Sequence, residues 1–370
     1  MTIFFWILIF LVTYTYFGYP LILVIVAKFK KNGTAKAEIY PSVSIIIAAH
    51  NEEKDIKNKL DNALSLDYPK EKLEIIVASD NSEDRTNEIV RNYNDSHLKL
   101  IAFSEHKGKT YVQNEAAREA NGEIILFSDA TTSYESQLIK KIVKNFVDPN
   151  VGAVGGELIF VNKTKSSIGN GTGLYWKYEK FLKNKESRIS SLIGVSGCCY
   201  AVRKNLYEPI SPDLISDFVI AQLIYKKGKK VVYEPEAISY ENTCDNPTEE
   251  FRMRVRIAIR TLYGVWKMKE LLNPFKYGFF TVQLISHKIL RYLIPPILIF
   301  LFLLNIVLVT LNPELVYKFI FCLQIVFYVT AVFSRGMPYY FCLTNLALLI
   351  GFWKFLLGEK KVLWSPSRKE

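Results

Sequence analysis

The sequence contains little cysteine and even less histidine. Its 370 residues include 5 cysteines and 4 histidines, and none of them follows a CxxC or Cys/His spacing. An odd number of cysteines without such spacing predicts neither a zinc site nor a disulfide framework, so we expect a reduced, cytoplasmic soluble part. The histidines form no cluster and no Ser/His/Asp order, which gives hydrolase chemistry no support.

Charge is scarce at both ends of the chain and concentrated in its middle. The net charge is +11, while half of all residues are hydrophobic. A basic balance suits nucleic acid, but lysines and arginines beside membrane segments explain it equally well, and no known nucleic-acid-binding module is present. The composition therefore predicts a membrane protein with a soluble centre and no nucleic-acid partner.

The first apolar run covers residues 2–27 and carries no charge. About 20 apolar residues are enough to cross the hydrocarbon core of a bilayer. The run has neither the basic start nor the small-residue cleavage pattern of a signal peptide. Lys28, Lys30 and Lys31 follow it directly, and positive charge of this kind is typical of the cytoplasmic side. We expect one transmembrane helix followed by a cytoplasmic domain.

The C-terminal part of the chain is expected to enter the membrane again. The expected segments are an interfacial stretch at 274–291, transmembrane helices at 292–311 and 319–335, a last apolar segment at 337–357 and a basic tail at 358–370. A third crossing would place the basic tail outside, against the positive-inside rule. The last apolar segment is therefore expected to re-enter from the cytoplasm or to lie in the interface, with a full span as the alternative.

Between about residues 40 and 273, short β-rich runs alternate with helical stretches, which is typical of βαβ units and a parallel sheet. Strands are predicted at 43–48, 73–79, 98–103, 123–128, 153–161, 198–202 and 230–233, and helices at 52–65, 82–92 and 110–120. The GNGTG run at 169–173 lacks the lysine of a phosphate-binding P-loop. We interpret it as a mobile loop on the acceptor side.

Acidic side chains end two of the predicted strands, Asp80 after the second and Asp129 after the fourth. In open parallel sheets, ligands bind at the carboxyl ends of the strands. Carboxylates there can bond a ribose or base and hold a divalent cation against a diphosphate. Asp80 could equally cap the helix that follows it. Asp129 ends a buried run, so it needs a partner that offsets its desolvation.

Three motifs follow one another in a fixed order. They are PSVSIIIAAHNEE at 41–53, IIVASDNSEDRT at 75–86 and KGKTYVQNEAAREANGEIILFSDA at 107–130. In order and spacing the chain resembles the family 2 inverting glycosyltransferases, in their membrane-bound polysaccharide-synthase-like branch. The segments at 194–207, 216–237 and 251–260 are similar to acceptor-side segments of that family. The resemblance covers nearly the whole chain. It implies an α/β, GT-A-like nucleotide-sugar-binding domain with a mainly parallel sheet at 40–273, flanked by transmembrane helices.

The resemblance also implies a role for each matching side chain. Transfer from a nucleotide sugar must neutralise a departing diphosphate and remove a proton from the attacking hydroxyl. The implied roles are catalytic base for Asp217, nucleotide-sugar binding for Glu52, Asp80, Lys109, Asn114 and Asp129, phosphate contact for Arg252, Arg256 and Arg260, and binding of Mg²⁺ or Mn²⁺ for Asp129. A basic helix that lies on anionic lipid is the alternative for the arginine run.

Three positions depart from the family's pattern. Thr131 stands where the metal motif usually has its second acid, and Ser216 precedes the implied base where an acid is common. The QxxRW motif of processive synthases is absent. Metal binding would therefore depend on Asp129, phosphate and water, with the Thr131 hydroxyl as a further candidate, and processive polymerisation is in doubt.

The expected function is inverting transfer of a sugar from a nucleotide sugar to a cell-surface polysaccharide or a lipid-linked glycan. A transferase that loads one sugar onto a polyprenyl phosphate is the closest alternative. The alternative from another class is an inactive nucleotide-sugar-binding subunit of a polysaccharide export complex. The expected partners are a nucleotide-sugar donor, first of all a UDP-sugar, a glycan or lipid-linked acceptor, membrane lipid, and export or polymerase subunits. The expected location is the inner membrane.

Overall fold

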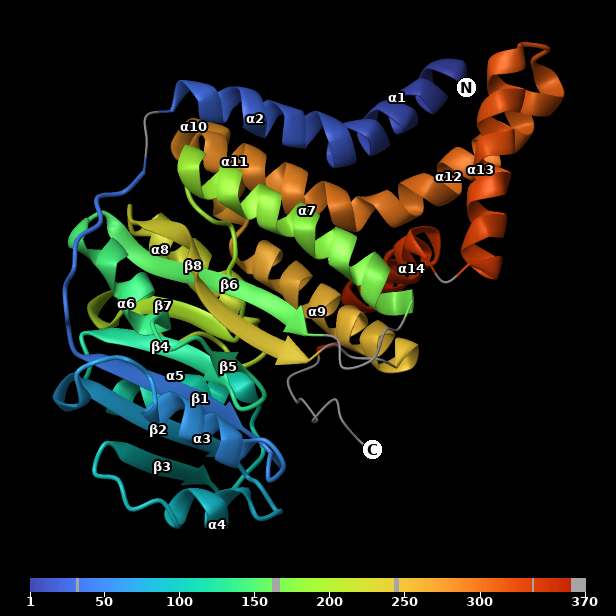
Figure 1. Ribbon diagram of the computed structural model, residues 1–370. Coiled ribbons are helices and arrows are strands. Elements are labelled where there is room, and N and C mark those ends of the chain that lie inside the picture. The colour runs from blue at the N-terminus through green and yellow to red at the C-terminus, as the bar shows by residue number, and fades with distance from the viewer. Residues whose placement is uncertain (31–32, 162–166, 243–245, 335, 361–370) are drawn as a thin grey trace.

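The structure, a computed structural model, describes residues 1–30, 33–161, 167–242, 246–334 and 336–360, without the side chains of 167–172. It consists of an α/β domain built on one sheet and a group of long helices along one side of it (Figure 1). Lys31 and residues 361–370 of the predicted basic tail lie outside the described residues.

One eight-stranded mixed sheet forms the core of the α/β domain, in the order β3-β2-β1-β4-β7-β6-β8-β5. Its strands are β1 (Val43–Ala49), β2 (Leu73–Asp80), β3 (Leu98–Phe103), β4 (Ile124–Asp129), β5 (Ser133–Tyr134), β6 (Val151–Val161), β7 (Cys199–Arg203) and β8 (Lys230–Asn242). The pairs β3–β2, β2–β1, β1–β4 and β6–β8 are parallel. Strand β7 is antiparallel to both β4 and β6, and β5 is antiparallel to β8. The predicted α/β class with a mainly parallel sheet is confirmed.

Helices cover both faces of the sheet. On one face lie α3 (Ile56–Leu64), α4 (Thr86–Arg91) and α6 (Leu138–Val143), and on the other α5 (Lys109–Glu119) and α8 (Ser216–Lys226). Strand β1 shows the reason, because all of its residues are buried. Its Ile45 and Ile47 pack in the first layer, while Ile46 and Ala48 pack in the second. Each fully buried isoleucine contributes about 1.5–3 kcal/mol.

Two predictions about the secondary structure are wrong, one for the end of a strand and one for a loop. Strand β8 continues to Asn242 instead of ending at Tyr233, because residues 235–237 are skipped in the pairing with β6 and pairing then resumes. Pro235 cannot donate a ladder hydrogen bond, which is why the sequence suggested an end there. The GNGTG run lies inside helix α7 (Ser167–Ile189) and is not a loop. Its glycines are weak helix formers, but α7 packs against α2, α14 and β8, and these contacts outweigh that weakness.

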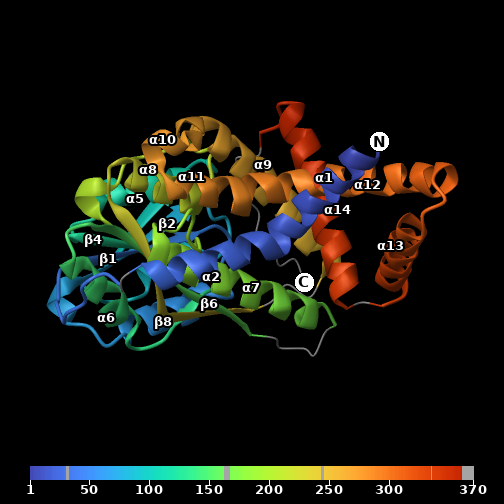
Figure 2. The same ribbon diagram turned by 90° about the horizontal axis from the view of Figure 1, so that it is seen from above.

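Four apolar helical segments are long enough to cross a membrane: Thr2–Phe29, Phe279–Leu311, Leu315–Phe333 and Met337–Leu356. They comprise α1 (Thr2–Thr13), η1 (Tyr14–Gly18), α2 (Tyr19–Phe29), α11 (Phe279–Leu284), η6 (Ile285–Ile289), α12 (Leu290–Leu311), α13 (Leu315–Phe333) and α14 (Met337–Leu356). The N-terminal helices pack along α7 and α12, as the two directions of view in Figures 1 and 2 show. An interfacial or re-entrant position for α14 stays a prediction.

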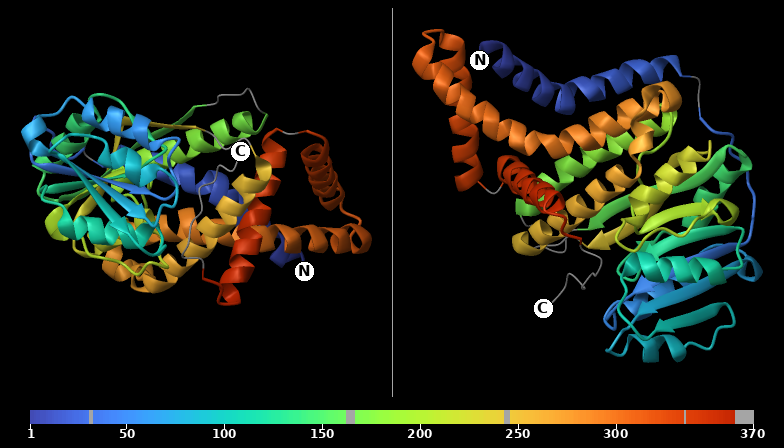
Figure 3. Two further views of the ribbon diagram at one scale, coloured as in Figure 1. Left: turned by 90° about the horizontal axis from the view of Figure 1, so that it is seen from below. Right: turned by 180° about the vertical axis from the view of Figure 1, so that it is seen from behind.

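Helix α9 (Pro247–Lys267) connects the apolar helices to the α/β domain. Its Val255 and Ile259 pack against Ala347 of α14. The chain continues from α9 through a turn (Lys269–Leu272) and the short α10 (Pro274–Tyr277) into α11. Three further short turns of 3-10 helix lie at Lys70–Lys72, Lys144–Val147 and Lys204–Leu206. Seen from behind, α9 lies between the sheet and the apolar helices (Figure 3). The helix that carries the predicted phosphate-binding arginines therefore stands at the boundary of both parts.

Candidate active site

Two linked turns shape the edge at the carboxyl ends of β1 and β2. Asn51 and Asn81 follow these strands with φ values of 54° each, a left-handed conformation that asparagine tolerates better than most residues. The backbone N–H of Asn51 donates to Ser82 Oγ at 3.1 Å, and its side-chain oxygen accepts from the N–H of Glu83 at 2.8 Å. The two strand ends are thus fixed to one another.

Asp80 is fully buried at the end of β2. Its carboxylate accepts the backbone N–H groups of Lys107 and Gly108, both at 2.8 Å, and lies 2.8 Å from Nδ1 of His106. Gly108 has a φ of 92°, which a side chain would disfavour. Asp80 therefore fixes the segment from which α5 begins. Nucleoside contact by Asp80 stays a prediction.

Beside Asp80, the rings of His50 and His106 stack at 3.9 Å with 10° between their planes. His50 Nδ1 also lies 2.6 Å from the carbonyl oxygen of Asp80. No sequence pattern indicates this pair, because the two residues belong to different loops. Glu52 is buried nearby, and its N–H donates to Thr86 Oγ1 at 2.8 Å. These groups form the β1–β2 side of the site.

Lys109 and Asp129 form an ion pair between the start of α5 and the end of β4. Burial alone would favour the neutral amine, but Asp129 holds the pKa of Lys109 above its usual value. This pair supplies the partner that a carboxylate at the end of a buried strand requires. Two residues further on, Thr131 Oγ1 donates to Glu241 Oε1 of β8 at 3.2 Å. Within the described ranges, no three His, Cys, Asp or Glu side chains form a metal cluster.

Asp217 lies in the first turn of α8, half-buried, with its carboxylate against Gly197. Burial raises the pKa of the Asp217 carboxyl, and the charges of Lys109, Lys288 and Arg260 oppose the rise. Asp129 acts on Asp217 in the same direction as burial. The structure thus brings Asp217 and Asp129 to one site, with Lys109 acting on both.

The three predicted phosphate-contacting arginines of α9 differ in their surroundings. Arg260 is buried and donates to Thr110 Oγ1 at 2.9 Å and to the carbonyl of Pro212 at 3.2 Å. Arg252 is exposed. Arg256 is half-buried and, among the described residues, makes no hydrogen bond or ion pair. Burial lowers its pKa and the charge of Asp129 opposes this, so Arg256 faces the Asp129 side of the site.

Asn114 lies one turn further along α5 and has a packing role. Its amide nitrogen donates to the carbonyl of Ile210 at 2.7 Å, and its oxygen accepts from Tyr207 Oη at 2.8 Å and from the N–H of Ile210 at 3.2 Å. The amide thus anchors the segment after β7. Contact between Asn114 and the nucleotide sugar stays a prediction.

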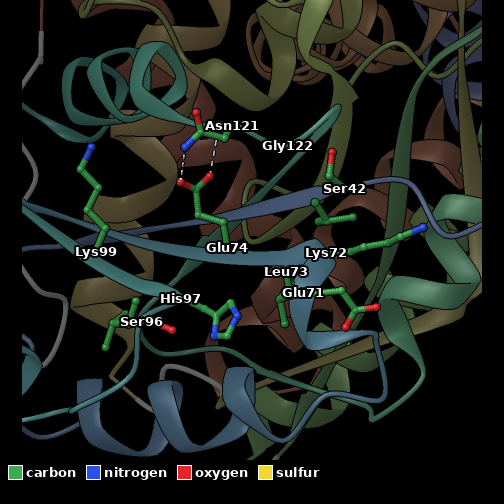
Figure 4. Close-up of a pocket in the computed structure, with 12 residues that line it drawn as sticks. Ser42, Glu71, Lys72, Leu73, Glu74, Ser96, His97, Lys99, Asn121 and Gly122 are labelled. Atoms are coloured by element: carbon green, nitrogen blue, oxygen red, sulfur yellow. Dashed lines mark hydrogen bonds between the residues drawn. The ribbon is translucent and has the colours of Figure 1, made fainter.

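A hollow at the opposite edge of the sheet is separate from this candidate site (Figure 4). It lies at the amino ends of β1 to β4, beside Ser42, Leu73 and Gly122. Glu74 there accepts from the backbone and side-chain N–H groups of Asn121. Ligands of such sheets bind at the carboxyl ends, so this hollow is not the candidate site.

Comparison with known proteins identifies similar sequences and a similar fold. Residues 44–210 match the family model described as glycosyl transferase family 2. A Bacillus subtilis protein named probable glycosyltransferase YdaM is 28% identical over 272 residues, which is 65% of this chain and 62% of that protein. A poly-beta-1,6-N-acetyl-D-glucosamine synthase of Staphylococcus epidermidis is 24% identical over 242 residues, which is 62% of this chain and 58% of that protein. The chain thus matches about six tenths of the length of these curated relatives.

A solved structure has the same fold over nearly its full length. The mannosyltransferase PcManGT from Pyrobaculum calidifontis, in complex with GDP-Man and Mn²⁺, superposes with a TM-score of 0.75 at 22% identity, covering 96% of this chain and 99% of that one. The GT-A-like fold expected from the motifs is therefore confirmed. Residues 44–210, which carry most of the motifs described above, are thus similar to glycosyltransferase family 2.

Proposed function

We propose that the protein is a membrane-bound inverting glycosyltransferase that transfers a sugar from a nucleotide sugar to a growing cell-surface polysaccharide or a lipid-linked glycan. The observation that carries this proposal is the placement of Asp217 and Asp129 around Lys109. A carboxylate for the acceptor and an acid–lysine pair for the diphosphate thus lie within one site. Both carboxylates are in place, so an inactive binding subunit is not favoured.

The reaction needs one displacement. The acceptor hydroxyl oxygen forms a bond to the anomeric carbon, and the bond from that carbon to the diphosphate breaks, with its electron pair going to the diphosphate. Asp217 accepts the hydroxyl proton, for which it must be ionised. Attack opposite the leaving group inverts the anomeric centre. Lys109 and Arg256 stabilise the charge of the departing diphosphate. Arg252 and Arg260 lie on the same face of α9 as Arg256 and add positive charge there.

The donor is a nucleotide sugar, and a UDP-sugar is the first candidate. The PcManGT structure holds GDP-Man, which supports this donor class. The nucleoside would bind on the β1–β2 side, beside Asp80, Glu52 and the His50–His106 stack, with Asn114 holding the pocket wall.

The oxygen atoms that the site offers as ligands fit a divalent cation, Mg²⁺ or Mn²⁺. Asp129 offers a carboxylate, and Thr131 holds the Glu241 carboxylate on the same side. Oxygen ligands of this kind suit hard cations, and PcManGT was solved with Mn²⁺. Asp129 would hold the ion, which would supply positive charge to the diphosphate when bound. Lys109 already supplies one such charge without it.

The apolar helices would hold the enzyme in the inner membrane, with the α/β domain in the cytoplasm where nucleotide sugars are made. Lys28 in the last turn of α2 and Lys30 at its C-terminal cap support this orientation. Export or polymerase subunits are the expected protein partners.

The test is a donor panel with the purified full chain in detergent. Release of nucleoside diphosphate is measured for UDP- and GDP-sugars with membrane extract as the acceptor source. One donor should give turnover that Asp217→Asn removes and that Asp67→Asn, at a surface carboxylate paired with Lys140, leaves unchanged. Equal turnover by Asp217→Asn and wild type would reject the proposal.

A further inference from the structure

Two lysines flank Asp217 on the side that faces the apolar helices. Lys183 of α7 donates to Ser196 Oγ at 3.1 Å, and Ser196 precedes the Gly197 that supports the Asp217 carboxylate. Lys288 of η6 has its Nζ 5.8 Å from the ring centre of Phe218, the residue after Asp217. The two lysines therefore approach the surroundings of Asp217 from separate elements, Lys183 through Ser196 and Lys288 beside Phe218.

The carboxylates nearest to these lysines already have other partners. Glu179 pairs with Arg291 and lies 3.2 Å from His287 Nε2. Glu186 lies 2.8 Å from His287 Nδ1 and accepts from Tyr19 Oη at 2.5 Å. Glu179 and Glu186 are both at least 95% buried within this network. They are thus committed to holding α7, α2 and η6 together.

Lys183 and Lys288 themselves take part in no ion pair with any residue that the structure describes. The charge of Lys183 acts on Lys288, and the charge of Lys288 acts on Asp217. The diphosphate of the donor does not explain them, because Lys109, Asp129 and Arg256 already occupy its side. Two partly buried ammonium groups without an ion-pair partner among the described residues favour a second anion beside the base.

The position of Lys288 in the chain also indicates the source of this anion. The candidate span Phe279–Leu311 has 33 residues, or about 50 Å of helix, whereas the hydrocarbon core is about 30 Å thick. The charge-free stretch from Tyr292 to Leu311 fills that thickness by itself. Lys288 therefore lies just outside the core, at the level of lipid phosphates.

We propose that Lys183 and Lys288 bind the diphosphate of a lipid-linked acceptor, whose first sugar presents its hydroxyl to Asp217. This proposal rests on the function proposed above and names its acceptor class. The lipid chain extends from the lysines into the membrane, and the sugar reaches from the lysines to the base. The hydroxyl loses its proton to Asp217, and the diphosphate of the acceptor stays intact.

The experiment compares acceptors with and without a diphosphate between lipid and sugar, and includes one whose only negative charge is on the sugar. Purified full chain in detergent receives the active donor with farnesyl-diphospho-N-acetylglucosamine, with uncharged octyl N-acetylglucosaminide, or with octyl glucuronide. The diphosphate acceptor should have a kcat/KM at least about 10²-fold above that of the octyl glycoside, since each hydrogen bond to a charged group is worth about ten-fold or more. Equal use of the charged and uncharged acceptors, or equal use of the glucuronide, would overturn the proposal.

The variants Lys183→Met and Lys288→Met keep the length of the side chain and remove its charge. Each should lower kcat/KM for the diphosphate acceptor about ten-fold or more. Because the charge of Lys288 also opposes the raised pKa of Asp217, the rates are compared on the alkaline plateau of the pH profile, where Asp217 is ionised and the octyl glycoside rate should stay within about threefold. Lys288→Arg should restore most of the loss. Lys185→Met is the matched control, because Lys185 lies on the same helix and packs on Phe181 instead. Losses of the same size with both acceptors would show a structural role only.

A binding measurement separates the two proposals. Calorimetry with farnesyl diphosphate and no donor reports on the lysines even if the donor is misassigned. Wild type should bind it at least about ten-fold more tightly than Lys183→Met or Lys288→Met, with each variant's nucleotide binding unchanged as evidence of folding. Equal binding would reject the lysine site. Failure of every donor to turn over would reject the proposed function alone.

Discussion

A Cβ atom built on Gly197 would stand 2.8 Å from Oδ2 of Asp217, closer than real Cβ contacts come. The backbone carbonyl oxygen of Gly197 accepts a hydrogen bond from Lys109 Nζ at 3.4 Å. Gly197 therefore sets the distance between the carboxylate that we assign as base and the lysine that faces the diphosphate. Any side chain at this position must push the carboxylate away.

Gly197→Ala should lower kcat by about ten-fold or more with a melting temperature close to that of wild type. The carboxylate is the flexible end of a side chain, so it can move at little cost in folding, but a displaced base loses its reach. Rates and thermal unfolding in detergent check this. The matched control is Gly228→Ala, where no atom lies within 4 Å, although its φ of 75° costs some stability. Full activity of Gly197→Ala would contradict the close fit.

Asp217→Asn should lower transfer by about 10²-fold or more with donor affinity nearly unchanged, since the amide cannot accept the proton. Burial raises the pKa of Asp217, so wild-type activity should fall with decreasing pH at a higher pH than for an ordinary aspartate. A raised folded pKa also means that ionised Asp217 destabilises the fold at neutral pH. Asp217→Asn should therefore not lower the melting temperature. A pH–rate profile and a thermal scan measure both effects.

Asp129→Ala should abolish divalent-dependent binding of nucleoside diphosphate, because cation and diphosphate neutralise one another in the site. The Lys109–Asp129 ion pair and Thr131 together predict weak metal affinity without nucleotide. Lys109→Gln frees Asp129 and should increase the affinity of the apo protein for Mn²⁺. Calorimetry with Mn²⁺ alone tests this, and tight binding by the wild-type apo protein would show that further ligands exist.

Asp80→Asn should lower the free energy of unfolding by about 1–3 kcal/mol. The amide has one acceptor oxygen, so the N–H of Lys107 or of Gly108 loses its buried partner. The start of α5 would loosen, and donor affinity should fall with it. Chemical unfolding and nucleotide binding measure the two effects, with the surface variant Asp67→Asn as control. Unchanged stability would show that water replaces the lost acceptor.

The product of the purified chain should be a single addition or a short ladder. Processive synthesis needs an aromatic platform beside the base, and QxxRW is missing from the sequence. Trp266 of α9 is 65% exposed and packs with Lys269, while Trp176 lies against Phe160. Sizing the product made from labelled donor tests this, and a high-molecular-weight polymer made by the chain alone would contradict it.

The sequence alone determined the positions of most elements and of the donor-side acid. Buried strands such as β1, β2 and β4 are continuous apolar runs bounded by polar residues. Because this pattern lies within a few neighbouring residues, it can be recognised from the sequence. The apolar helices follow from length and composition in the same way. Asp129 followed from the rule that ligands bind where parallel strands end, and the implied base, Asp217, came from the family resemblance.

The tertiary structure alone decided which distant residues meet. Antiparallel β7, inserted between β4 and β6, brings Gly197 to Asp217 and to Lys109. The His50–His106 stack and the Lys183–Lys288 pair join loops and helices that are far apart in the chain. Periodicity reports only which face of its own element a residue occupies. Contacts across many residues depend instead on how the packed faces fit together, which no local pattern records.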